Sequence, residues 1–167
     1  VRVDARDDQV GEALEVAGRM MRAGANLPKI FRETFRKKDP AFMRLWGEAL
    51  MRIHLDPVSG FALSRVTSED LIRYGAKREA MVEFSGVLNT IAGSSAAAFL
   101  SQDPEDSSHI KGSLRSEGYK GVDVAQLAGA LGGGGHKLAA GFKIKSEWKE
   151  VIGKLIREAR AMTGGKV

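Results

Sequence analysis

The sequence predicts an α/β protein: a mixed sheet of about five strands with helices packed on it, preceded by a helical extension. Three observations lead to this prediction. Apolar residues recur every three or four positions between Val10 and Ile53, which is typical of helices. After Ile53, short apolar runs alternate with helical segments. Two connections between the runs have hairpin composition, which indicates antiparallel pairs within a mixed sheet.

The helical extension contains two or three helices. The apolar face of the first is formed by Val10, Leu14, Ala17 and Met21. Gly24 and Asn26 end this helix, and Pro28 is placed to begin the next. The basic stretch FRETFRKK is interpreted as a solvated helix face. A further apolar series comprises Phe42, Leu45, Trp46, Ala49 and Leu50. We place the domain boundary at its end, with residues 1–50 as the helical segment and 51–167 as the main domain.

The central part of the chain predicts two hairpins separated by helices. The turn residues 56–60 separate two short apolar runs, which is a hairpin pattern. Thr67 precedes Leu71 as a helix cap, and a helix is predicted from Arg78 to Ile91. A buried strand from Ser95 to Leu100, the turn QDPEDSS and the alternating strand HIKGSLRS then form the second hairpin.

The last part of the chain predicts helix, strand and helix around a glycine run. Asp123 caps the short helix VAQLAGAL, with Gln126 placed for a capping box. Gly132 to Gly135 follow, and then the strand AAGFKI. A closing helix runs from Glu147 to about Met162. Its buried face consists of Trp148, Val151, Ile152, Leu155 and Ile156.

Composition narrows the classes of partner. The formal charge is +5, and residues 1–60 and 61–167 share the excess almost equally, so a basic tail is excluded and any anion site is local. There is no cysteine, which excludes disulfides and suits a cytoplasmic protein. No apolar run approaches the roughly 18 residues of a membrane span, so no membrane partner is expected. The chain begins with Val1, and we expect a fragment of a longer protein.

The glycine run has two possible explanations, an anion-binding loop or a structural turn. A flexible linker does not fit, because linkers are long and rich in serine. Glycines allow positive φ and close approach of a ligand, and their N–H groups can converge on an anion. If a helical turn begins at His136, its N–H groups add to this site. The ring of His136 and the charge of Lys137 would contribute further.

A second basic residue strengthens the anion-binding interpretation. Arg115 ends the strand HIKGSLRS and is flanked by Ser113 and Ser116. A guanidinium beside hydroxyl groups suits bidentate phosphate binding, and ligands collect at strand ends in sheet proteins. The nearby glycine run distinguishes this arginine from an ordinary surface residue.

These residues carry a resemblance to a known family. GGGHKLAAG, Gly133 to Gly141, resembles the GGGHxxAAG signature of the DHH-associated C-terminal domain of DHH-family phosphoesterases. SLRSEGYKGVDVAQLAGAL is similar to the segment before that signature, and EVAGRMMRAGANLPKIFRETF resembles the last helices of the catalytic DHH domain. Within the family the chain looks most like the oligoribonuclease and phosphoadenosine-phosphate phosphatase type.

The resemblance implies roles for individual residues. Gly133, Gly134, Gly135 and His136 would contact substrate phosphate, and Arg115 matches the family's substrate-binding arginine; Ser113 and Lys137 complete the candidate set. The family hydrolyses phosphodiester bonds with manganese (Mn²⁺) or magnesium (Mg²⁺) held by Asp and His residues of the DHH domain. This chain lacks that domain, so we expect it to bind substrate without cleaving it and to hold no catalytic residue.

The other candidate ligands are better explained as structure. His54 and His109 are isolated, and the acids Asp103, Glu105 and Asp106 belong to a hairpin turn. Short single-stranded RNA or DNA, or nucleotide phosphates, are the expected partners. Two alternatives stay open: a nucleic-acid-binding module like the related domain of alanyl-tRNA synthetases, and a cyclic-dinucleotide phosphodiesterase or sensor. The sequence leaves the particular substrate and the oligomeric state undetermined.

Overall fold

The computed structural model describes residues 5–35, 39–76, 81, 83–102 and 105–164. Its elements fall into two compact units, Val1–Asp39 and Pro40–Val167. No helix within the described residues is both long and apolar enough to cross a membrane.

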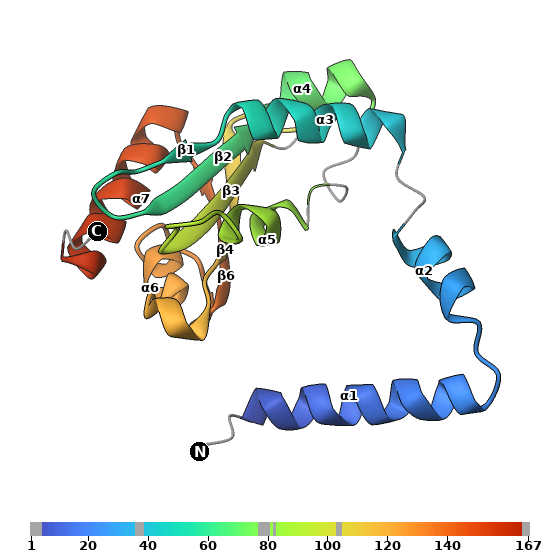
Figure 1. The fold of residues 1–167 in the computed structure, drawn as a ribbon. Helices are drawn as coiled ribbons and strands as arrows, with labels where there is room; N and C mark the ends of the chain where they lie inside the picture. The colour runs from blue at the N-terminus through green and yellow to red at the C-terminus, as the bar shows by residue number, and fades with distance from the viewer. Residues whose placement is uncertain (1–4, 36–38, 77–80, 82, 103–104, 165–167) are drawn as a thin grey trace. The chain divides into compact units, whose positions relative to one another are not determined.

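The first unit consists of helices α1 (Ala5–Arg22) and α2 (Leu27–Phe35) (Figure 1). Gly24 adopts a φ of +93° and its N–H donates to the carbonyl of Met21, which closes α1. Asn26 caps α2, because its Oδ1 accepts from the N–H of Lys29 at 3.0 Å. The predicted break is confirmed, although Asn26 begins the second helix. The apolar face of α1 is on the surface, with Leu14 68% exposed. The last part of FRETFRKK, residues 36–38, lies outside the described residues.

The second unit contains a mixed six-stranded sheet in the order β1-β2-β3-β4-β6-β5. Among the described strands, β2 and β3 are parallel, and the other neighbours are antiparallel. The mixed sheet is confirmed, with one strand more than predicted. The strands are β1 (His54–Leu55), β2 (Phe61–Val66), β3 (Ala96–Gln102), β4 (His109–Arg115), β5 (Gly134–His136) and β6 (Ala139–Lys145).

Helices cover the two faces of the sheet differently (Figure 1). Helices α6 (Val124–Gly129) and α7 (Trp148–Thr163) pack on one face, where the strands contribute residues such as Ile110 and Phe142. Helices α3 (Pro40–Met51), α4 (Ser68–Tyr74) and α5 (Phe84–Asn89) supply the core on the other face, over β2 and β3. Leu45 of α3 is fully buried there. Helix α3, which the sequence groups with the helical extension, contacts β2 and α4 and lies in the second compact unit. The domain boundary near residue 50 stays a prediction.

Local signals account for most of the connections. Thr67 forms a capping box with Asp70 at the start of α4, and the two predicted hairpins, β1–β2 and β3–β4, are present. Asp123 caps α6 by accepting from the N–H of Ala125, but the predicted capping box is wrong. The amide of Gln126 turns to the Asp123 carboxylate instead, at 3.4 Å. The helix predicted from Arg78 to Ile91 appears as α5 at 84–89, and residues 77–80 and 82 are not among those described.

Candidate phosphate-binding site

The sheet register brings Arg115 and His136 into one row. Arg115, the last residue of β4, lies opposite Ala139 of β6, and Ala139 lies opposite His136 of β5. Residues directly opposite each other in antiparallel strands point to the same face. The two basic residues therefore share a face of the sheet, with backbones about 10 Å apart, two strand spacings.

A second row on this face contains no bulky side chain. Ser113 of β4 lies opposite Gly141, which lies opposite Gly134. Ser113 and Gly141 are half-buried and Gly134 is exposed. The predicted site residues thus come together around a shallow, glycine-floored surface next to Arg115 and His136.

The glycine run does not begin a helix. The predicted helical turn at His136 is wrong, because His136 ends β5 and pairs with Ala139 of β6. Lys137 and Leu138 form the two-residue turn between these strands, and Lys137 is exposed. No further strand pairs with β5 among the described residues. An edge strand leaves N–H groups without strand partners, so any free backbone donors of this segment lie on a strand edge and not at a helix terminus.

Both ends of the turn are fixed to the domain. The carbonyl of Lys137 accepts from the N–H of Val124 at 2.9 Å, at the start of α6. The carbonyl of Leu138 accepts from the N–H of Ser116 at 3.1 Å, just beyond β4. These two bonds hold the hairpin against the strand end that carries Arg115, so the candidate site is built on ordered backbone.

Three of the four glycines have a structural reason. Gly132 follows α6 at a φ of +76°. A Cβ on Gly133 would lie 2.6 Å from the Cβ of Phe142 and closer still to the carbonyl oxygen of Gly141. Gly135 has a φ of +144°, and its Cβ would lie 2.6 Å from the Cα of Ala140.

Gly134 is the exception. A Cβ there would meet nothing within 4 Å, and its φ lies outside the positive range that favours glycine. The fold therefore tolerates a side chain at this position, which points to the face shared with Arg115. Open space above Gly134 is what close approach of a ligand requires.

The contacts of the Arg115 side chain differ from those of the arginines that form buried ion pairs. Its Nη1 donates to the carbonyl of Leu114 at 2.9 Å, and no carboxylate among the described residues pairs with it. Arg52 and Arg160, in contrast, bind the buried carboxylates of Asp70 and Asp56. Ser116 does not flank Arg115 on this face: it is buried, and its Oγ contacts the carbonyl of Ser95 at 3.4 Å.

Sequence reasoning missed a polar pocket near the same strand end. Lys120 donates to the carbonyl and Oδ1 of Asn89 and to Oγ of Ser94, at 2.5, 3.0 and 2.9 Å. Burial lowers the pKa of Lys120. With Tyr119, these residues line a cavity of about 410 Å³. Because all three donors of the lysine are used within the protein, Lys120 serves to fix the loop after α5. No local pattern in the sequence marks so long-range a contact.

The described residues do not fit a metal site. No group of three His, Asp or Glu side chains able to hold an ion is found among them. His109 contacts the Asp106 carboxylate at the hairpin turn, where bonds from Ser108 and His109 lower the pKa of Asp106. His54 is exposed in β1. Asp103 lies outside the described residues.

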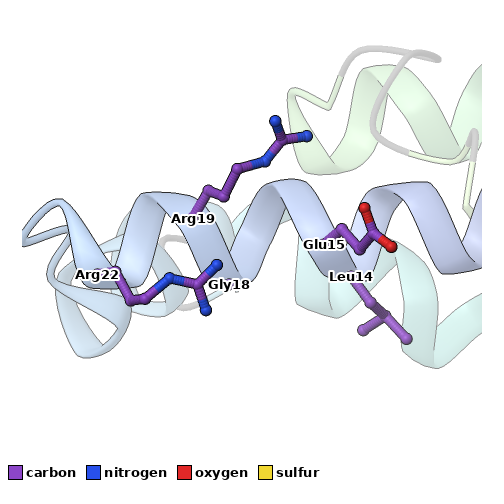
Figure 2. A pocket seen from close by; sticks show the side chains of 5 residues that line it. All are labelled: Leu14, Glu15, Gly18, Arg19 and Arg22. Atoms are coloured by element: carbon purple, nitrogen blue, oxygen red, sulfur yellow. The ribbon is translucent and has the colours of Figure 1, made fainter.

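A hollow on the first unit lacks the features of a binding site. All of its lining residues come from the single helix α1, so no second element closes it. In Figure 2 the guanidinium groups of Arg19 and Arg22 do not point towards each other. The lining residues are Leu14, Glu15, Gly18, Arg19 and Arg22.

The fold is an α/β domain that gathers polar residues at strand ends, where ligands of such domains bind. Comparison with known proteins gives the family. The model of the DHHA1 domain matches residues 60–165, and the chain belongs to this family. The predicted resemblance to DHH-family phosphoesterases is thereby confirmed.

Relatives of known description are consistent with this assignment. The chain is 31% identical over 134 residues to the bifunctional oligoribonuclease and PAP phosphatase NrnA of Thermus thermophilus, a match covering 80% of this chain and 38% of that protein. The chain thus spans about two fifths of the relative's length.

Two solved structures show the same fold. An exopolyphosphatase-related protein from Bacteroides fragilis superposes with a TM-score of 0.78 at 24% identity, covering 90% of this chain and 43% of that one. The pGpG-specific phosphodiesterase PggH from Vibrio cholerae superposes with a TM-score of 0.54 at 17% identity, covering 90% of this chain and 51% of that one.

Proposed function

We propose that this chain is the substrate-binding part of a metal-dependent phosphoesterase that hydrolyses short oligonucleotides or nucleotide phosphates. The observation that carries the proposal is the row Arg115–Ala139–His136 beside the open surface at Gly134. The description of the Thermus relative as an oligoribonuclease and PAP phosphatase supports the same class of substrate.

In this proposal the residues of the chain position phosphate. Arg115 offers a planar guanidinium that binds two phosphate oxygens at once. His136 and Lys137 add donors from the hairpin, and Gly134 leaves room for the phosphate to reach the sheet. Holding the phosphate in one orientation makes attack by a nucleophile effectively intramolecular, which is itself catalytic.

Cleavage then depends on residues outside this chain. Manganese or magnesium, which the family resemblance implies, would be held there and would activate water for attack. The chain alone binds oligonucleotides and does not hydrolyse them, with or without Mn²⁺.

The test measures binding and cleavage together. A 5′-labelled diribonucleotide is titrated with this chain, with the Arg115→Ala variant and with Arg157→Ala, which removes an arginine from α7 on the other side of the sheet. We expect Arg115→Ala to weaken binding by about 1.5–3 kcal/mol, the range for a hydrogen bond to a charged group, and Arg157→Ala to have no effect. Equal binding by Arg115→Ala and the unchanged chain would contradict the proposal.

A further inference from the structure

One part of the sheet carries basic residues and no acidic ones. Strand β4, strand β5, strand β6 and the turn between the last two contain five Lys or Arg residues and no Asp or Glu. The whole chain has 26 basic and 21 acidic residues, so five basic residues without an acidic one are a local departure from its nearly balanced composition. The five are Lys111, Arg115, Lys137, Lys143 and Lys145.

Three of these lysines share the face of Arg115. Lys111 lies two rows from Arg115 along β4 and opposite Lys143 of β6. Lys145 lies one row further, opposite His109. The intervening residues Ile110, Leu114 and Phe142 are buried on the opposite face, beneath α6 and α7. We call Lys111, Lys143 and Lys145 the lysine row.

The lysine row presents two exposed charges. Lys143 and Lys145 are exposed, and neither forms an ion pair with a carboxylate in the described part of the chain. The carboxylate of Asp106, at the nearby hairpin turn, is bound to His109. The two exposed ammonium groups can therefore meet an anionic ligand.

We propose that the lysine row binds the phosphates of a single-stranded oligonucleotide whose terminal phosphate lies at Arg115 and His136. This inference rests on the proposed function and adds a preference for substrates longer than a dinucleotide. Along β4, at about 3.4 Å per residue, Lys111 lies about 14 Å from Arg115. Lys145, which is opposite His109, lies about 20 Å from Arg115 in the same direction.

The width of the row favours one nucleic-acid strand. Lys111 and Lys143 are on neighbouring strands about 5 Å apart, so the charges follow a narrow line along the strand direction. In a B-form duplex the two backbones are separated by a major groove about 12 Å wide, so the row would contact one of them. A single extended strand can lay successive phosphates along the line.

The experiment compares two lengths of ligand at several salt concentrations. Labelled oligoribonucleotides of two and six nucleotides are titrated with this chain in EDTA, by fluorescence anisotropy, between 50 and 300 mM KCl. We expect the hexamer to bind more tightly and with a slope of log K against log salt steeper by about 2, since each neutralised phosphate of a single strand contributes about 0.7.

Two triple variants distinguish binding by the lysine row from an effect of net charge. Lys111→Gln/Lys143→Gln/Lys145→Gln is expected to reduce hexamer affinity to that of the dimer and lower the slope by about 2. Dimer affinity should change less than threefold. Lys149→Gln/Lys154→Gln/Arg157→Gln removes the same charge from α7 on the other face and should leave both affinities nearly unchanged. Urea unfolding checks that both triple variants are folded.

Several outcomes overturn the proposal. Equal affinity of the unchanged chain for dimer and hexamer removes the length preference, while dimer binding that still depends on Arg115 keeps the proposed function. Equal losses in both triple variants would reduce the effect to net charge. A duplex RNA that competes as well as the hexamer would contradict a single-strand track. Failure to bind either oligonucleotide overturns the proposed function as well.

Discussion

Replacing Gly134 by alanine separates a glycine needed for binding from glycines needed for folding. The added methyl group meets no atom within 4 Å, so the free energy of unfolding should change by no more than about 0.5 kcal/mol. The same methyl group projects from the face that carries Arg115 and His136 and occupies the space available to a phosphate. We expect dinucleotide affinity to fall at least tenfold, which corresponds to about 1.4 kcal/mol.

The matched control is Gly133→Ala. Its Cβ would lie 2.6 Å from the Cβ of Phe142 and 2.7 Å from its Cα, and backbone atoms of β6 cannot move aside as a flexible side chain does. Overpacking of this kind costs about 1–3 kcal/mol, so Gly133→Ala should lose stability by that amount. Urea unfolding followed by circular dichroism measures stability, and anisotropy measures binding. The reasoning is refuted if Gly134→Ala binds as well as the unchanged chain, or if both variants lose equal stability.

Three further predictions concern other residues. Arg115→Lys should recover less than half of the binding free energy lost in Arg115→Ala, measured by the same titration, because an ammonium cannot make the bidentate contact; full recovery would show that charge alone suffices. A hydrogen bond from Arg52 lowers the pKa of Asp70 from 3.8 to about 2. The ionised carboxylate therefore stabilises the folded state by about 2 kcal/mol above pH 4, and this stabilisation is lost as the pH falls towards 2. Urea unfolding at pH 6 and pH 2 should therefore show a large deficit for Asp70→Asn at the higher pH alone, and an equal deficit at both would contradict the assignment. Gly112→Ala should destabilise the domain by about 1–3 kcal/mol, because its Cβ would enter the ring of Phe142, and Phe142→Leu should recover part of this loss in the double variant; additive losses would exclude the contact as the cause.

Elements with strong local signals were predictable from the sequence. The caps at Thr67 and Asp123 follow from side chains that accept backbone N–H bonds within three residues. Strand β4 alternates buried and half-buried residues along its whole length, as HIKGSLR predicts. These features depend on neighbours in the chain, so their patterns can be recognised without knowing the fold.

Strand β5 was not predictable in this way. Glycine has a low propensity for strands, and nothing within Gly134 to His136 favours extended structure. The strand forms because β6 pairs with it and because the carbonyls of the turn bind α6 and the end of β4. Tertiary contacts outweigh local propensity here, and the sequence therefore pointed to a loop or a helical turn.

The residues of the candidate site could be picked out from the sequence, whereas their geometry could not. Arg115 and the glycine run stood out as separate motifs about twenty residues apart. Their common row depends on the β4–β6 register, and a slip by one residue would move Arg115 to the face covered by α6 and α7. The apolar residues Ile110, Leu114 and Phe142 exclude that slip, since it would expose them. The buried face of these strands thus determines where the basic residues point.

The two faces of the hairpin differ in what their glycines allow. On the buried face, Gly133 and Gly135 allow the hairpin to lie against β6 more closely than any side chain would permit. On the open face, Gly134 and Gly141 keep the sheet surface low between Arg115 and the turn. In the proposed function, the open space at Gly134 admits the phosphate, and donors on a tightly packed hairpin bind it without a cost for ordering the loop. The entropy of the four glycines is therefore lost during folding, and the proposed site is already formed before a ligand binds.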